Sequence, residues 1–214
     1  MIRIVLADDH EIVRAGFKMI LEQEPDLKVV AEAADGAQAY SIVSREKPDL
    51  LLMDISMPPG QSGLVACEKI AHDCPYTRIV ILTMFAEPEY LFYTLRGGAS
   101  GYMLKNSAPS ELVTAVRTVA AGGSYVHPKM AALLAEQLAG AGNGLDVSYQ
   151  QLTSRELEIL QLIAKGFTNK EISEKVFLSV KTIEAHRAKI YQKLGLKTRA
   201  DLVAYALRHK LLGL

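Results

Sequence analysis

Two kinds of hydrophobic pattern alternate over the first 121 residues. Five short apolar runs, rich in Val, Ile and Leu, are typical of parallel strands buried on both faces: Ile2–Ala7, Lys28–Ala31, Asp49–Met53, Arg78–Thr83 and Gly101–Leu104. Between them lie segments whose apolar residues have helical spacing: Glu11–Gln23, Gly36–Arg45, Gly63–Ala71, Pro88–Arg96 and Pro109–Ala121. This alternation predicts an α/β doubly wound domain, in which helices cover both faces of a parallel sheet.

The rest of the chain has only the helical pattern. Gly122 and Gly123 end the last helix of the first domain, and a short helix is expected at Pro128–Ala139, before the glycine-rich stretch 140–144. Four helices then follow: Ser154–Lys165 capped by Ser154, Asn169–Val176, Val180–Leu194 capped by Ser179, and Arg199–His209. The second and third of these make a helix-turn-helix. We therefore predict an α/β domain over 1–121, a linker with a short helix over 122–148, and an all-α four-helix domain over 149–214.

Composition excludes several classes of protein. With 50% apolar residues the chain is too hydrophobic for disorder. It contains no run of 18 or more apolar residues, the length that a membrane span needs. Its two cysteines, Cys67 and Cys74, are too few for a disulfide framework or a zinc site, and they are expected to be buried in a reducing compartment. A cytoplasmic protein with no membrane partner is expected.

The formal net charge of zero conceals an uneven distribution. Residues 1–130 contain 12 Lys and Arg against 16 Asp and Glu, whereas residues 131–214 contain 12 against 8. Within residues 179–214 the balance is 8 against 2. A basic C-terminal segment behind an acidic body indicates a nucleic-acid-binding half and a half with another role. The alternative is two solvated surfaces that merely differ in charge.

Five polar residues stand at the ends of the predicted strands. Ligands of an open parallel sheet bind at the carboxyl ends of its strands, so these side chains are expected to converge: Asp8, Asp9, Asp54, Thr83 and Lys105. Three carboxylates in one crevice repel each other unless a hard cation such as Mg²⁺ lies among them. A hydroxyl and an ammonium group can hold phosphoryl oxygens, and one carboxylate can act as a nucleophile that takes up phosphate. One such Asp alone could be a helix N-cap, but that alternative does not explain the set.

With these residues, 1–121 resemble the receiver domain of two-component response regulators, a flavodoxin-like fold. The resemblance implies that Asp54 is the phosphoacceptor, that Thr83 and Lys105 contact the phosphoryl group, and that Tyr102 is the switch aromatic. It implies a Mg²⁺ site made of Asp8, Asp9, Asp54 and the backbone carbonyl of Ser56. For Tyr102, ordinary packing in the fifth strand is an alternative.

Two positions depart from the usual receiver pattern. The glycine expected four residues after the Pro of Met57-Pro58 comes one residue late, at Gly63, which predicts a longer loop beside the site. Asn106 stands where many receivers have a proline after the lysine, so a cis peptide bond is not expected there. Neither change removes a chemical group from the site.

Residues 149–214 resemble the DNA-binding domain of the LuxR/NarL/FixJ type. The resemblance rests on Leu152-Thr153 with Arg155-Glu156, on Gly166, on Asn169-Lys170-Glu171-Ile172 and on the stretch from Ser179 to Leu194. In that stretch an apolar stripe, Ile183, Ile190 and Leu194, is expected to pack on the other helices. The opposite face and its edges are expected to contact DNA through Lys181, Thr182, Glu184, Ala185, Arg187, Ala188 and Lys189. The alternative, a solvated charged face, does not explain the basic excess.

Both resemblances together imply a phosphorylation-activated DNA-binding transcription regulator and not an enzyme. A sensor histidine kinase would phosphorylate Asp54, and the basic domain would bind operator DNA as a homodimer, for which the last helix offers Leu202, Val203, Ala206 and Leu207 or packs them within the domain. Within the family, DISMPPGQSGL, ILTMFAEPEYLF, SVKTIEAH and KLGLK most resemble the NreC-type oxygen regulatory proteins. That resemblance implies an NreB-like kinase and control of nitrate and nitrite respiration at low oxygen, with another stimulus as the alternative.

Two alternatives come from other classes. A phosphate-transferring or phosphate-hydrolysing α/β enzyme with an accessory domain is disfavoured because no glycine-rich nucleotide motif follows the first strand and no second general acid is apparent near Asp54. A constitutive DNA-binding protein whose first domain only dimerises is disfavoured by the complete set of Asp54, Thr83 and Lys105.

Overall fold

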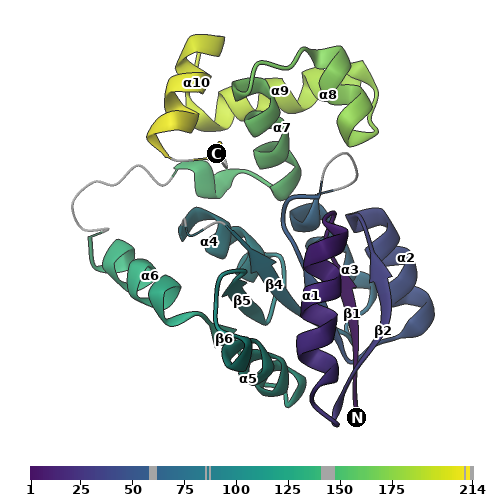
Figure 1. The fold of residues 1–214 in the computed structure, drawn as a ribbon. Coiled ribbons are helices and arrows are strands. Elements are labelled where there is room, and N and C mark those ends of the chain that lie inside the picture. The colour runs from purple at the N-terminus through teal and green to yellow at the C-terminus, as the bar shows by residue number, and fades with distance from the viewer. Residues whose placement is uncertain (58–61, 85, 87, 141–147, 210, 213–214) are drawn as a thin grey trace. The chain divides into compact units, whose positions relative to one another are not determined.

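The computed structural model describes residues 1–57, 62–84, 86, 88–140, 148–209 and 211–212 (Figure 1). These residues fall into two compact units, Met1–Glu136 and Gln137–Leu214. No helix in the described ranges is long and apolar enough to cross a membrane.

A six-stranded parallel sheet forms the centre of the first unit, in the order β2-β1-β3-β4-β5-β6. Its strands are β1 (Ile2–Ala7), β2 (Leu27–Ala33), β3 (Leu50–Met53), β4 (Arg78–Thr83), β5 (Gly101–Leu104) and β6 (Tyr125–Val126). The strand order reverses between β1 and β3, which pair directly with Ala7 opposite Met53. A reversal of this kind leaves a crevice at the carboxyl ends of the two strands, where ligands of such sheets bind.

Helices cover both faces of this sheet, as Figure 1 shows. On one face α1 (Glu11–Glu22) and α5 (Pro109–Ala120) bury Leu21, Leu112 and Val116 against alternate strand residues such as Leu6 and Leu52. On the other face α2 (Gly36–Glu46) packs on α3 (Gly63–Asp73), and α3 packs on α4 (Pro88–Arg96). The predicted α/β doubly wound, flavodoxin-like fold is confirmed, and both cysteines are free and buried, as expected.

The second unit is helical. After α6 (Pro128–Gly140), it contains the 3-10 turn η2 (Ser148–Gln151), α7 (Ser154–Ala164), α8 (Asn169–Val176), α9 (Val180–Leu194) and α10 (Arg199–Arg208). Its core consists of fully buried apolar side chains from all four of α7 to α10: Leu157, Leu160, Ile172, Ile183, Ile190 and Leu202. The four-helix prediction is confirmed.

The helix caps of this unit agree with the sequence at both ends of α9 and differ at the start of α7. Ser179 caps α9 by accepting a hydrogen bond from the backbone N–H of Thr182, and Gly195 ends that helix in the left-handed conformation, with φ 66°. The expectation that Ser154 caps α7 is wrong. Thr153 is the cap, because its hydroxyl accepts from the N–H of Glu156 while the Glu156 carboxylate accepts from the N–H of Thr153. This reciprocal pair satisfies two N–H groups that a cap at Ser154 would leave open.

Three strands differ from the sequence expectation. The strand expected at Asp49–Met53 begins one residue later, at Leu50. The strand expected at Lys28–Ala31 runs from Leu27 to Ala33, because pairing with β1 continues beyond the apolar run. The short strand β6 was not expected. It forms because the N–H groups of Tyr125 and His127 bond to the carbonyls of Ser100 and Tyr102 along the open edge of β5.

Candidate functional site

The carboxyl ends of β1, β3, β4 and β5 bring the predicted polar residues to one edge of the sheet. Asp8 directly follows β1, Asp54 directly follows β3, Thr83 ends β4 and Lys105 directly follows β5. Backbone hydrogen bonds fix this edge: the Asp54 N–H donates to the Ala7 carbonyl over 2.8 Å, and the Lys105 N–H donates to the Thr83 carbonyl over 2.8 Å. Asp8, Asp54 and Thr83 are all buried.

The ammonium group of Lys105 lies between two of the carboxylates. Its Nζ is 2.7 Å from Oδ2 of Asp54 and 2.5 Å from Oδ2 of Asp8. Burial raises the pKa of Asp54, and the Asp8 charge raises it further, whereas Lys105 and a backbone hydrogen bond from Ser56 oppose the rise. Burial alone would lower the pKa of Lys105, but its bonds to Asp54 and Asp8 outweigh that effect and raise it.

One oxygen of the third carboxylate, Asp9, accepts no hydrogen bond from the described residues. Its buried Oδ1 accepts none, although Nδ1 of the exposed His10 lies 2.8 Å away, within ion-pair distance when the imidazole is protonated. Asp8, Asp9 and His10 together place three potential ligand atoms within 4.8 Å of one another. A buried carboxylate oxygen that accepts no hydrogen bond, beside the Asp8 carboxylate, fits a divalent cation with oxygen ligands, whereas Asp54 is not among these three residues.

Gly63 lies against the backbone of the acidic site. It is the first residue of α3, its N–H donates to the Ile55 carbonyl over 2.8 Å, and a Cβ added there would collide with the Asp54 carbonyl. The glycine that comes one residue late therefore still makes the close approach that excludes any side chain. The longer loop expected before it falls on residues 58–61, outside the described residues.

Tyr102 and Thr83 are fully buried. Tyr102 lies in the middle of β5 opposite Ile81, and Thr83 lies opposite Leu104. The side chain of Thr83 is thus at the carboxyl edge with Lys105, whereas Tyr102 is two residues back within the sheet.

The predicted DNA-contact residues lie along one side of α9. Lys181, Glu184, Ala185, Ala188 and Lys189 are exposed, while Ile183 and Ile190 are fully buried on the opposite side. Thr182 is half-buried, and its hydroxyl lies 2.7 Å from that of Ser179. Five of the seven predicted side chains are thus open to a partner.

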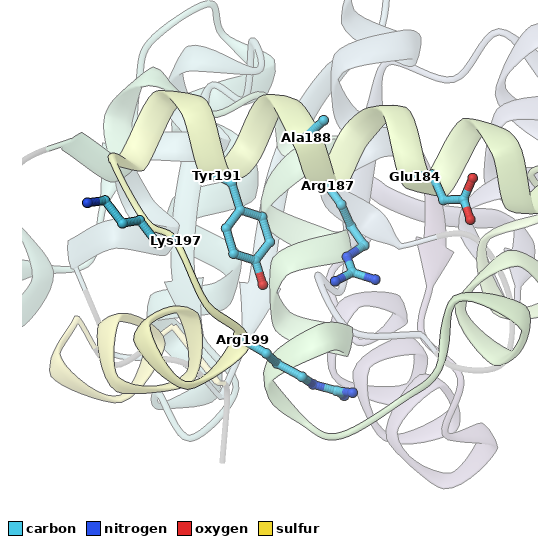
Figure 2. A pocket seen from close by; sticks show the side chains of 6 residues that line it. All are labelled: Glu184, Arg187, Ala188, Tyr191, Lys197 and Arg199. Atoms are coloured by element: carbon cyan, nitrogen blue, oxygen red, sulfur yellow. The ribbon is translucent and has the colours of Figure 1, made fainter.

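Arg187 differs from those five because its guanidinium is held within the domain. It is half-buried, and its Nη1 donates to Oδ1 of Asn169, the first residue of α8, over 2.7 Å. It borders a hollow of about 370 Å³ lined by Glu184, Arg187, Ala188, Tyr191, Lys197 and Arg199 (Figure 2). Tyr191, Lys197 and Arg199 were not among the predicted DNA contacts, and the last two lie beyond the end of α9. Their signal in the sequence is only that they belong to the basic stretch.

Comparison with known proteins assigns both units to families. Residues 4–117 match the response regulator receiver domain, and residues 150–206 match the bacterial regulatory proteins of the luxR family. The oxygen regulatory protein NreC of Staphylococcus carnosus (strain TM300) is 52% identical over 214 residues, which cover 98% of this chain and 99% of that protein. NreC of Staphylococcus aureus (strain MRSA252) is 54% identical with the same coverage.

Solved structures agree. RcsB from Salmonella enterica serovar Typhimurium, bound to a promoter in the presence of the phosphomimetic BeF3⁻, is 29% identical with a TM-score of 0.68, over 95% of this chain and 97% of that chain. A LuxR-family response regulator from Aurantimonas sp. SI85-9A1 is 38% identical with a TM-score of 0.62, over 65% of this chain and 99% of that chain. The chain therefore belongs to the two-component response regulators that carry a LuxR-type DNA-binding domain.

Proposed function

We propose that this regulator is switched by phosphorylation of Asp54 and then binds operator DNA as a homodimer. The observation that carries the proposal is the position of Lys105, whose ammonium group contacts the buried carboxylates of both Asp8 and Asp54 at the switch point of the sheet. In this proposal 1–121 form the receiver, 122–148 the linker and 149–214 the DNA-binding domain.

The proposed reaction is transfer of a phosphoryl group to a carboxylate. An Asp54 oxygen attacks phosphorus, the bond from phosphorus to the donor breaks, and the donor leaves with the electron pair of that bond. Lys105 supplies positive charge next to the attacked group, and the Thr83 hydroxyl is the neighbouring hydrogen-bonding group from β4. Tyr102, buried beside this edge, would change its packing as Thr83 moves.

Mg²⁺ is the proposed cofactor, held by Asp8, Asp9, Asp54 and the backbone carbonyl of Ser56. Support comes from the three carboxylates and from Asp9 Oδ1, which is buried and accepts no hydrogen bond among the described residues, although Nδ1 of His10 lies 2.8 Å away. When bound, the ion neutralises charge between the phosphoryl oxygens and the carboxylates.

The relatives support a finer biological role. Proteins that are 52% and 54% identical over nearly the whole chain are named oxygen regulatory proteins. We infer that this chain responds to low oxygen through an NreB-like sensor histidine kinase and controls genes of nitrate and nitrite respiration. Transcript levels of such genes, compared with and without oxygen in cells that carry or lack the protein, test this role.

The phosphorylation step is tested with matched variants. Asp54→Asn should abolish labelling by a small-molecule phosphodonor and abolish the gain in promoter binding that the donor produces. Asp73→Asn is the control, because Asp73 ends α3, which runs back from the site, and its carboxylate bonds to Tyr40 and His72. Stoichiometric labelling of Asp54→Asn would show that another residue is the phosphoacceptor.

A further inference from the structure

The hollow beside α9 has the positive charge and the hydrogen-bond donors that suit an anion. Arg187 from α9 and Lys197 and Arg199 from the segment after Gly195 contribute three positive charges, against one carboxylate, Glu184. Figure 2 shows Arg187 and Tyr191 extending from α9 toward the segment that carries Arg199. In the part of the chain that the structure describes, none of the three cations forms an ion pair with Glu184.

Both guanidinium groups are held in place by neutral partners. Arg187 Nη1 donates to the Asn169 amide oxygen over 2.7 Å, and Arg199 Nη2 donates to the carbonyls of Ile163 and Phe167 over 3.0 and 3.1 Å. Neutral acceptors orient an arginine without cancelling its charge. A guanidinium has five N–H donors, so each side chain keeps donors for a ligand, in a fork that matches phosphate oxygens.

The hollow is continuous with the exposed face of α9. Ala188 belongs to both, and Glu184 lies one helical turn before it on the edge of that face. A second hollow, at the start of α8, is lined by the same two arginines together with Thr168, Asn169 and Lys170. Arg187 and Arg199 therefore border both hollows, and a ligand that lies along α9 can contact them from either one.

We propose that the hollow of Arg187, Tyr191, Lys197 and Arg199 binds a backbone phosphate of the operator, so that the segment between α9 and α10 holds DNA while α9 reads it. This inference rests on the proposed DNA-binding function. A phosphodiester supplies the two charged oxygens that a guanidinium pair recognises, and it carries no sequence information, so this site fixes register and leaves base choice to the face of α9. A free phosphate shares this chemistry, and the test separates the two sources.

Lys197 is the residue to change. Its side chain is exposed and makes no bond within the described residues, so Lys197→Gln is expected to fold, whereas Arg199 also holds two carbonyls. The matched control is Arg208→Gln, which removes one exposed charge at the far end of α10, about 13 Å along the helix from Arg199. Binding of the phosphorylated full-length variants to a selected operator is measured over a range of salt concentrations.

Lys197→Gln should lower the slope of log affinity against log salt by about one counterion. The loss of affinity between 50 and 200 mM salt should therefore be smaller in Lys197→Gln than in the parent protein, by a factor of roughly 3.5. Arg208→Gln should keep the parent slope. Neutralising single operator phosphates as methylphosphonates should reveal a position that weakens the parent protein but not Lys197→Gln.

Three outcomes would overturn the inference. They are an unchanged salt slope in Lys197→Gln, an equal effect of the two variants, or no methylphosphonate position that separates Lys197→Gln from the parent. Competition by millimolar inorganic phosphate that is lost in Lys197→Gln, with unchanged operator binding, would instead assign the hollow to a free anion. If the phosphorylated parent protein binds no DNA at all, the proposed function fails rather than this site.

Discussion

Lys193 of α9 donates a hydrogen bond of 2.6 Å to Oε2 of Glu156, the third residue of α7, and so ties the DNA-facing helix to a helix 37 residues earlier. Glu156 is only 3% exposed, and the same oxygen accepts the N–H of Thr153 in the cap of α7. One carboxylate thus closes a helix end and anchors α9. The orientation of the DNA-contact face therefore depends on an ion pair between a buried carboxylate and a half-buried lysine, which is not itself on that face.

Glu156→Gln should destabilise the DNA-binding domain by about 1–3 kcal/mol, because it removes the charge that Lys193 contacts while keeping an oxygen for the cap. Lys193→Met should cost more, because it leaves a buried carboxylate without its cation. Urea unfolding of the full chain, followed by circular dichroism at 222 nm, measures both free energies. Arg155→Met, which breaks only the pair with Glu158 in the same helix, is the control for loss of a cation.

The same pair predicts how stability depends on pH. Burial tends to raise the pKa of Glu156, but Lys193 and the groups of Thr153 outweigh it and hold the pKa below the ordinary value of 4.5. The unfolded chain therefore binds this proton more readily, so the contribution is complete above about pH 4.5 and is lost as the pH falls through the folded pKa. Unfolding free energies measured between pH 7 and pH 3 should fall less steeply in Glu156→Gln, and an identical pH dependence would remove Glu156 as the cause.

Gly63→Ala should damage the acidic site without touching its charged groups. The added methyl group would collide with the Asp54 carbonyl, so either α3 or the end of β3 must move. We expect a loss of about 1–3 kcal/mol of stability, typical of overpacking, and slower labelling of Asp54 by a phosphodonor. Gly16→Ala is the control, since a Cβ at that position has no heavy atom within 4 Å. Normal labelling of Gly63→Ala would show that the position of the Asp54 backbone does not limit phosphorylation.

Removal of divalent cations should stop labelling of Asp54. The three carboxylates would then face an anionic donor, and the single charge of Lys105, which contacts Asp8 and Asp54, would not balance theirs. Asp9→Asn should weaken Mn²⁺ binding by at least roughly tenfold, since it removes a negative charge and one carboxylate oxygen from the proposed metal site. Calorimetry or paramagnetic resonance measures this affinity. Asp73→Asn should bind the ion as the parent does. Equal affinity in Asp9→Asn would place the cation elsewhere.

The sequence was sufficient for the acidic site because its geometry follows from topology. In a parallel sheet, a residue that directly follows a buried apolar run lies at the carboxyl edge. The sequence alone therefore predicts that Asp8, Asp54 and Lys105 lie close together. The cap of α7 shows a different limit. Thr153 and Ser154 are both good capping residues, and only the three-residue spacing from Thr153 to Glu156 distinguishes them.

Other features depend on contacts that no local pattern encodes. The two residues of β6 are too few to show a period, and they become a strand only because β5 offers an open edge. Arg187 has the spacing of a DNA-contact residue, but its hydrogen bond to Asn169 arises from how α8 packs on α9. For the same reason, Arg199 reaches the hollow only because α10 packs on α7, where Arg199 donates to the carbonyls of Ile163 and Phe167.

The last prediction concerns base reading by α9. Glu184 is exposed, is the one acidic residue of this helix, and lies at the edge of a hollow lined by three cations. A carboxylate there repels phosphates, so we expect it to accept a hydrogen bond from a cytosine amino group. The alternative is that Glu184 pairs with Lys181 or Arg187 along the helix. The described residues contain no such ion pair, and Arg187 bonds to Asn169 instead.

Glu184→Ala should therefore relax base preference at one position in each half-site, by about 1–3 kcal/mol. Lys189→Ala, an exposed cation on the other edge of the face, should weaken all sequences alike and lower the salt slope by about one counterion. Selection of operators from a random pool with each variant distinguishes the two roles. An unchanged consensus for Glu184→Ala would show that this carboxylate does not read a base, and a changed consensus for Lys189→Ala would show that the lysine does more than hold phosphate.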